Sequence, residues 1–301
     1  MRRRADNTLH VVSLTNPPAH GAPSISSGPP ARRGAVTALA ATVLAVTLGL
    51  LAWGPMPIEP QAQRYADGRA WLNVPNALNV LTNLPVFWLA VWGWCATHTS
   101  TWPRSLRVPM QWFHLSALVT SLISASHHAT PNDAMYVLVA VGQAISFGML
   151  ALALFSDRLD HRFGSAAACA CGATAFGLAG AAMLYAGPAS GATDLRPLVL
   201  LEVASILFIL MGALNLPGAH TLNSNWVVLL FLYALSRILG FGDAVIFRTT
   251  GWISGHSLMH LSLAATVGWV AYWASVVPRR GDAGRSPSAQ SQRHTSLNTT
   301  A

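Results

Sequence analysis

The stretch AMYVLVAVGQAISFGMLALALF, residues 134–155, contains no charged side chain. An α-helix of about 20 residues is long enough to cross the roughly 30 Å hydrocarbon core of a bilayer. We therefore predict a membrane-spanning helix at this position. Comparable apolar runs predict seven further spans, at residues 35–53, 77–97, 108–127, 165–186, 197–216, 225–242 and 256–277.

The composition of the whole chain agrees with this interpretation. Of its 301 residues 52% are hydrophobic and only 9% are charged, whereas about 25% are charged in a typical soluble domain. We predict an all-α, polytopic membrane helix bundle over residues 35–278. The Arg/Pro/Ser-rich segment 1–34 and the segment 279–301 show no apolar periodicity and are predicted to be disordered tails. The length of the first span and the lack of a small-x-small cleavage site favour a retained helix over a signal peptide.

The cationic residues indicate membrane topology rather than nucleic-acid binding. The formal net charge is +8, every cationic residue is an arginine, and the arginines cluster in the tails and in loops between apolar runs. This is the distribution of topology signals, and it argues against a nucleic-acid partner. With both termini in the cytoplasm, the cytoplasmic side holds the N-terminal tail and Arg104, Arg107, Arg158, Arg162, Arg279 and Arg280. The opposite side holds Arg64, Arg69, Arg196 and Arg248.

Three histidines are predicted to share one depth near the outer face. His128 ends the third span, whereas His256 and His260 begin the eighth, four residues apart and therefore on one face of a helix. Three neutral imidazoles that leave a fourth position for water are the pattern of catalytic zinc sites. Ser124 lies four residues before His128, so its hydroxyl is expected to face the same centre.

The spacing alone leaves a second interpretation open, in which membrane histidines hydrogen-bond neighbouring helices and bind no metal. His127 is rotated by about 100° from the face of Ser124 and His128, so we expect it to be a bystander. His114 lies deep in the third span and is expected to pack between helices.

Other cofactors fit the sequence less well than zinc. The chain has no lysine, which excludes retinal bound through a Schiff base. Haem needs one or two axial ligands, so a cluster of three histidines fits zinc better. Cys95, Cys169 and Cys171 all lie inside apolar runs, where packing is the expected role; this applies also to the Cys-x-Cys pair.

Four segments together resemble a known family: DGRAWLNVPNALNVLTNLP (67–85), SASHHATPN (124–132), DLRP (194–197) and GWISGHSLMH (251–260). They are similar to the CREST superfamily of membrane hydrolases, and most similar to the bacterial branch of the alkaline ceramidases. The resemblance implies a seven-helix core around a zinc ion, with the span at 35–53 as an extra N-terminal helix. It also implies a bacterial inner-membrane location.

By this resemblance His128, His256 and His260 would bind zinc, and Ser124 would lie beside the metal-bound water. The implied activity is zinc-dependent cleavage of an amide bond in ceramide or another N-acyl lipid, with membrane lipid as the substrate. The natural acyl chain and the oligomeric state are not specified by the sequence.

One departure from the family concerns catalysis. The family has an aspartate eleven residues after its first zinc histidine, and here that position is Val139. Asp133 is the nearest acid but falls in the preceding loop. The alternative is therefore a catalytically weakened or inactive zinc-binding membrane protein that acts as a lipid sensor or scaffold.

A second departure concerns calcium, which the ceramidases bind before their first core helix. Asp67, Asn73 and Asn76 occupy that region, and oxygen ligands of this kind suit calcium. Only one of these three residues, Asp67, is acidic. The segment PNALN (75–79) is also a plausible helix start, so both interpretations stay open.

Overall fold

The computed structural model describes residues 29–59, 63–190 and 193–276. Within these ranges the structure is all-α apart from isolated β-bridges such as that between Trp71 and Val74. The predicted all-α helix bundle is thereby confirmed. Most of the two predicted tails lies outside the described residues.

Eight of the described helices have 17 residues or more, and each predicted span coincides with one of them to within a few residues. These helices are α1 (Pro29–Trp53), α3 (Asn83–Thr99), α4 (Arg104–Ala129), α5 (Asp133–Arg158), α6 (Ala166–Ser190), α7 (Arg196–Asn215), α8 (Asn223–Phe241) and α10 (Gly255–Val276). Three shorter elements join them: α2 (Ala77–Leu81), η2 (His161–Gly164) and α9 (Asp243–Thr250).

The start of α1 corrects the predicted boundary of the N-terminal tail. The helix begins at Pro29, so residues 29–34 are helical rather than disordered. Proline is favoured in the first turn of a helix, because its φ is already helical and its missing N–H has no partner to lose there.

Among the described residues, six helical segments are long and apolar enough to cross a membrane: α1, α2 together with α3, α5, α6, α7 and α8. The chain therefore has the architecture of a multi-pass membrane protein. The helices α4 and α10 are not among the six, and these two carry the histidines singled out above. The arrangement of seven core helices plus one extra helix stays a prediction.

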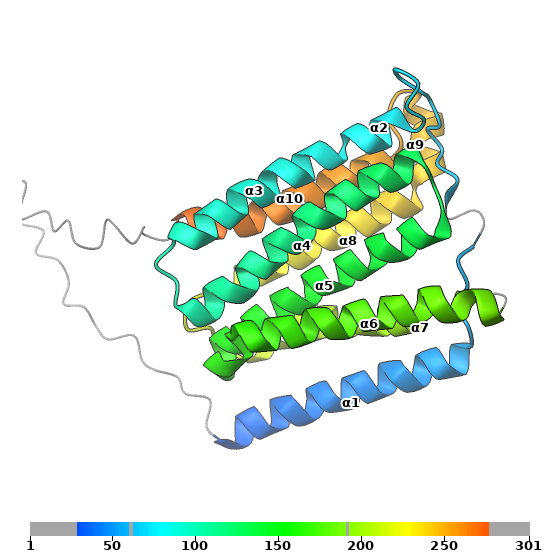
Figure 1. Cartoon of the computed structure of the whole chain (residues 1–301). Coiled ribbons are helices and arrows are strands. Elements are labelled where there is room, and N and C mark those ends of the chain that lie inside the picture. The colour runs from blue at the N-terminus through cyan, green and yellow to red at the C-terminus, as the bar shows by residue number, and fades with distance from the viewer. Residues whose placement is uncertain (1–28, 60–62, 191–192, 277–301) are drawn as a thin grey trace, which may run out of the picture.

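The helices form a ring with two peripheral members (Figure 1). The ring runs α3, α4, α5, α7, α8 and α10, and α10 packs back against α3. The helix α6 packs mainly against α5, and α1 packs on α7. Fully buried side chains inside the ring include Met110, Met149, Ile209, Trp226 and Val270.

Many large apolar side chains lie on the outer surface of the bundle. Examples are Leu44, Leu48 and Leu51 on α1, Trp88 on α3, Leu178 on α6 and Leu214 on α7. A soluble monomer rarely exposes so much apolar surface in contiguous patches. This surface fits contact with lipid.

At the end of the bundle opposite the histidines, two adjacent charged residues of α5 bond the end of α7 and the segment that follows it. The guanidinium of Arg158 donates hydrogen bonds to the carbonyl oxygens of Gly212 and Leu216. The carboxylate of Asp157 accepts a hydrogen bond from the Thr221 hydroxyl at 2.6 Å. Arg158 thus donates to carbonyl oxygens at the C-terminal end of α7, including that of the cap residue Leu216. The sequence indicated Arg158 only as a topology signal, and the structure adds a structural role.

Candidate metal centre

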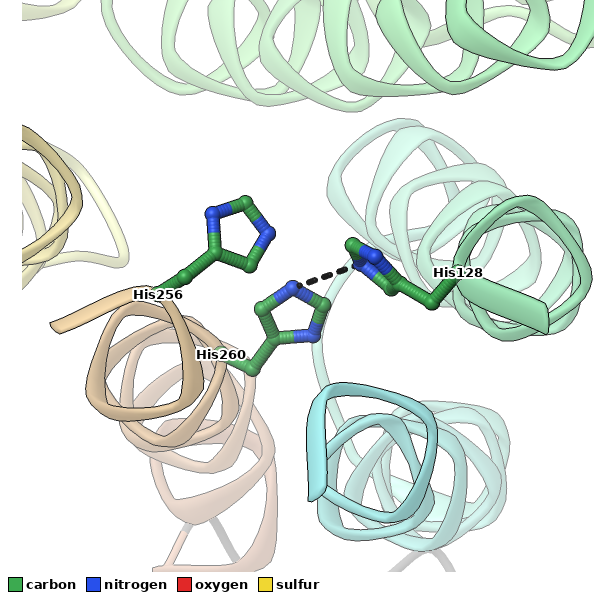
Figure 2. Close-up of side chains that lie close together, drawn as sticks. All are labelled: His128, His256 and His260. Carbon is green, nitrogen blue, oxygen red and sulfur yellow. Dashed lines mark hydrogen bonds between the residues drawn. The ribbon is translucent and has the colours of Figure 1, made fainter. Parts of the chain in front are cut away.

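The candidate site lies at the end of the bundle where α4 ends and α10 begins (Figure 1). His128 comes from α4, and His256 and His260 come from successive turns of α10. One possible ligand atom from each of the three lies within 4.8 Å of the others. Figure 2 shows the three imidazoles between the two helices, and the Nε2 atoms of His128 and His260 are 3.2 Å apart. This cluster has the geometry to hold a metal ion.

The surroundings of the three rings also suit an ion. His128 and His260 are only 2% and 3% exposed, and His256 is partly buried. The Nδ1 atom of His128 is buried without a hydrogen-bond partner among the described residues. A buried polar atom without a partner is uncommon in native structures. These features fit a site that is completed by a ligand.

Hydrogen bonds from two loops fix the helices that carry the histidines. Asp243, at the start of α9, accepts a hydrogen bond from the backbone N–H of His256 at 2.8 Å and another from that of Ala66 at 2.9 Å. The side-chain amide of Asn76 donates to the carbonyl oxygen of His128 at 2.9 Å. The first turn of α10 and the last turn of α4 are therefore both bonded to neighbouring segments.

Tyr65 covers the cluster. Its ring lies 4.6 Å from that of His128 and 4.7 Å from that of His256, measured between ring centroids. Burial raises the pKa of the Tyr65 phenol above its ordinary value, so the hydroxyl stays protonated and can donate a hydrogen bond. Tyr65 was not predicted from the sequence, because a single tyrosine in a loop has no distinctive spacing.

The two other histidines of α4 lie outside the cluster, as predicted. His127 is buried and packs edge-on against Tyr136 of α5, with ring centroids 6.0 Å apart. It is not part of the three-histidine group. His114 is fully buried, and its ring occupies the space beside Gly93 of α3, where a Cβ would overlap it.

Contacts between the antiparallel helices α4 and α5 place Val139 near the level of Ser124. Ser124 is buried, one turn before His128. The Ser116 hydroxyl of α4 donates to the carbonyl of Gly142 on α5, and a Cβ at Gly142 would overlap Thr120. Val139 precedes Gly142 by three residues and therefore lies on the same face of α5. Because the two helices are antiparallel, Val139 lies near the level of Ser124.

The segment for which calcium binding was considered uses its polar groups for other contacts. Both carboxylate oxygens of Asp67 accept hydrogen bonds from the Arg69 guanidinium, each at 2.7 Å. This ion pair holds the pKa of Asp67 below its ordinary range. Asn76 begins α2 in a left-handed conformation and donates to His128, and Asn73 is also left-handed. The geometry favours the interpretation of this segment as a helix start over the calcium site.

The cysteines do not form a second metal site among the described residues. Cys169 is buried and Cys171 is exposed on α6, and Cys95 lies far from both in sequence, on α3. Residues two apart point to different sides of a helix. This placement fits packing as the role of Cys169 and Cys171 better than a shared ion.

Two charged residues inside membrane-spanning helices were missed at the level of sequence. Glu202 lies in α7 and Arg237 in α8, although the arginines were expected in tails and loops. A charged residue inside an apolar span is itself a signal of function. That signal identifies both residues without any structure.

Comparisons of the chain with models of protein families, with curated proteins and with solved structures gave no match.

The contact of α10 with α8 leads to a first prediction. A Cβ at Gly255 would overlap the carbonyl oxygen of Leu239 and lie 2.7 Å from the Cα of Asp243. Gly255→Ala should therefore displace the turn that carries His256, with a loss of about 1–3 kcal/mol of stability and a lower zinc content. Thermal unfolding in detergent and metal analysis measure the two effects.

Gly177→Ala is the matched control for Gly255→Ala. Gly177 lies in α6, and a Cβ there would meet no atom within 4 Å. The control should be neutral or slightly stabilising. Equal behaviour of the two variants would contradict the packing argument.

Proposed function

We propose that this protein is an integral membrane hydrolase that uses zinc to cleave an amide bond in a ceramide-like or other N-acyl lipid. The observation that carries the proposal is the convergence of three imidazoles, two of them buried and one partly buried, at one end of a bundle of apolar helices. A site at the end of a membrane helix bundle fits a lipid as the substrate class.

The donor set supports zinc as the metal. Imidazole nitrogens are common zinc ligands, at bond lengths of about 2.0–2.1 Å. Two nitrogens of a tetrahedral zinc site are then about 3.3 Å apart, which is close to the 3.2 Å between the Nε2 atoms of His128 and His260. Three protein ligands with an open fourth position are typical of catalytic rather than structural zinc.

The resemblance to the CREST superfamily supports the reaction. The Ser-x-x-x-His element of α4 and the His-x-x-x-His element of α10 occur in the family's order, and they belong to adjacent parts of one bundle end. When bound, zinc would act as a Lewis acid and lower the pKa of a coordinated water to about 7.

The residues of the chain then have separate roles. His128, His256 and His260 hold the metal, and Asn76 and Asp243 fix the helix ends that carry them. The Ser124 hydroxyl would donate a hydrogen bond to the carbonyl oxygen as negative charge develops on it. Tyr65 closes the site on the side away from the bundle and limits access of bulk water.

The membrane location follows from the same proposal. The arginine distribution supports cytoplasmic termini, and this orientation would put the histidines near the outer face. The family resemblance indicates the inner membrane of a bacterium.

Val139 favours a second candidate, a zinc-binding lipid sensor or scaffold without hydrolase activity. Val139 has an aliphatic side chain at the position where the family has a carboxylate, so that position offers no acid–base group. Loss of such a group typically lowers the rate about 10²–10⁴-fold.

A hydrolysis assay separates the two candidates. Full-length protein, purified in detergent and loaded with zinc, is incubated with a panel of N-acyl lipids, and the released fatty acid and amine are measured by mass spectrometry. The hydrolase proposal predicts both products in equal amounts, and none with His260→Ala. Zinc-loaded protein that releases no product from any lipid of the panel would favour the sensor or scaffold.

A further inference from the structure

Arg237 occupies an unusual position for an unpaired cation. It lies four residues before the end of α8, a helix apolar enough to span a membrane, and its side chain is exposed. No carboxylate lies within ion-pairing distance of its guanidinium in the part of the chain that the structure describes. A cation at such a position is costly in a membrane unless it has a partner, and for this reason it commonly marks a functional site.

The groups around Arg237 come from three other helices. Tyr233 lies one turn before Arg237 on the same face of α8, and its hydroxyl bonds Glu202 of α7 and contacts Gln143 of α5. Near the same end of α8, the carbonyl oxygen of Leu239 lies against Gly255 at the start of α10. Arg237 therefore belongs to the same end of the bundle as the histidine cluster, on a face of α8 that turns towards α5 and α7.

Glu202 does not neutralise Arg237 directly. Its Oε1 accepts a hydrogen bond from the Tyr233 hydroxyl at 2.5 Å, and the same hydroxyl also contacts the side-chain amide of Gln143 at 3.4 Å. The carboxylate is thus held by α8 and α5 residues one turn deeper than Arg237. The guanidinium keeps its donors available for a ligand.

We propose that Arg237 binds an anionic group, a carboxylate or a phosphate, of the lipid whose acyl amide lies at the histidine cluster. This inference rests on the proposed function and specifies its substrate class: N-acyl lipids with a negatively charged head, such as N-acyl amino acids, are preferred over neutral ones. A planar guanidinium forms two parallel hydrogen bonds with either anion.

The depth of Arg237 fits a lipid headgroup. Four residues of helix correspond to about 6 Å, so the guanidinium lies just inside the end of α8. Trp71 and Trp252 are exposed at the same end of the bundle, with 60% and 65% of their surface accessible. Tryptophan is enriched at the interface between hydrocarbon and headgroups, which places Arg237 close to that interface.

The experiment measures binding without turnover. Full-length protein in detergent is treated with a chelator, and displacement of a fluorescent N-acyl lipid is followed with three competitors of identical acyl chain: N-palmitoylglycine, N-palmitoylethanolamine phosphate and neutral N-palmitoylethanolamine. Inorganic phosphate and acetate are tested as free anions. The wild type is compared with Arg237→Gln, Arg237→Lys and Arg248→Gln.

Arg248→Gln is the matched control, because Arg248 is an exposed arginine of α9 at the same end of the bundle. Both glutamine variants remove one positive charge there, so general electrostatic attraction changes equally. We expect the wild type and Arg248→Gln to bind both anionic lipids at least about tenfold more tightly than the neutral one. Arg237→Gln should lose this preference, and Arg237→Lys should retain part of it.

Three other results would count against the anion site or its assignment to a lipid, or would need a second variant. Equal affinity of the wild type for charged and neutral lipids, or an unchanged preference in a folded Arg237→Gln variant, would overturn the inference. Competition by free phosphate or acetate at the concentrations of the lipids would overturn the assignment to a lipid. If Arg237→Gln does not fold, the lipid preference of the wild type and its reduction in Arg237→Lys decide the question.

The inference and the proposed function fail differently. A preference for anionic lipids without hydrolysis of any of them contradicts the hydrolase and leaves the Arg237 site standing. Hydrolysis of charged and neutral lipids at equal rates and with equal affinities contradicts only the Arg237 site.

Discussion

Replacement of His128, His256 or His260 by alanine should each weaken zinc binding by at least about 100-fold, since even the loss of a residue that only supports a zinc ligand typically weakens binding about 10–100-fold. The three possible ligand atoms lie within 4.8 Å of one another, so all three are needed to complete the site. Zinc content per protein after dialysis, measured by plasma mass spectrometry, gives the result directly.

His127→Ala is the control for these variants. His127 is adjacent to His128 and equally buried, but it packs against Tyr136 outside the cluster. Its replacement should leave zinc near the wild-type level. Loss of zinc from His127→Ala, with retention in a folded His128→Ala, would show that the assignment of ligands within residues 124–131 is wrong.

Val139→Asp should raise hydrolysis of an N-acyl lipid by about tenfold or more, because a general acid–base group typically contributes about 10²–10⁴-fold. Position 139 lies on the face of α5 that packs against α4, near Ser124, so a carboxylate there can exchange protons with water at the histidine cluster. The same change should lower stability by about 3 kcal/mol, the cost of a carboxylate at membrane depth. Turnover per zinc-loaded molecule is the measurement.

Val139→Asn tests whether the gain depends on acid–base chemistry. Asparagine has nearly the shape and polarity of aspartate but does not titrate at neutral pH, so no gain is expected. Equal stimulation by both substitutions would indicate a wetter cavity rather than a proton carrier. A Val139→Asp variant that folds, binds zinc and is no faster than the wild type would rule out the explanation based on this position.

The helices and the three histidines were predictable because local physics determines them. The run 134–155 contains no charged residue and is long enough to span a membrane as a helix, and α5 follows it closely. His256 and His260 meet because of helical periodicity. His128 joins them because helices that cross a membrane alternately bring the end of one span to the start of another.

The positions of the loop residues around the histidine cluster depend on tertiary contacts that leave no periodic pattern in the sequence. Tyr65 lies in a loop that is held by Asp243, 177 residues away along the chain. The interpretation of Asp67 depends on whether Arg69 turns back to bind it, and the sequence does not specify this. By contrast, Arg237 was predictable in principle, because a charged residue inside the apolar run 225–242 is a local signal.

We propose that one zinc ion is held by these three imidazoles at the end of the membrane bundle. X-ray absorption at the zinc edge of the purified wild-type protein identifies both the metal and its neighbours. We expect one zinc per chain, with nitrogen and oxygen neighbours at about 2.0–2.1 Å and the outer-shell scattering of three imidazoles. Sulfur neighbours at about 2.3 Å, or protein that does not retain zinc at all, would contradict it.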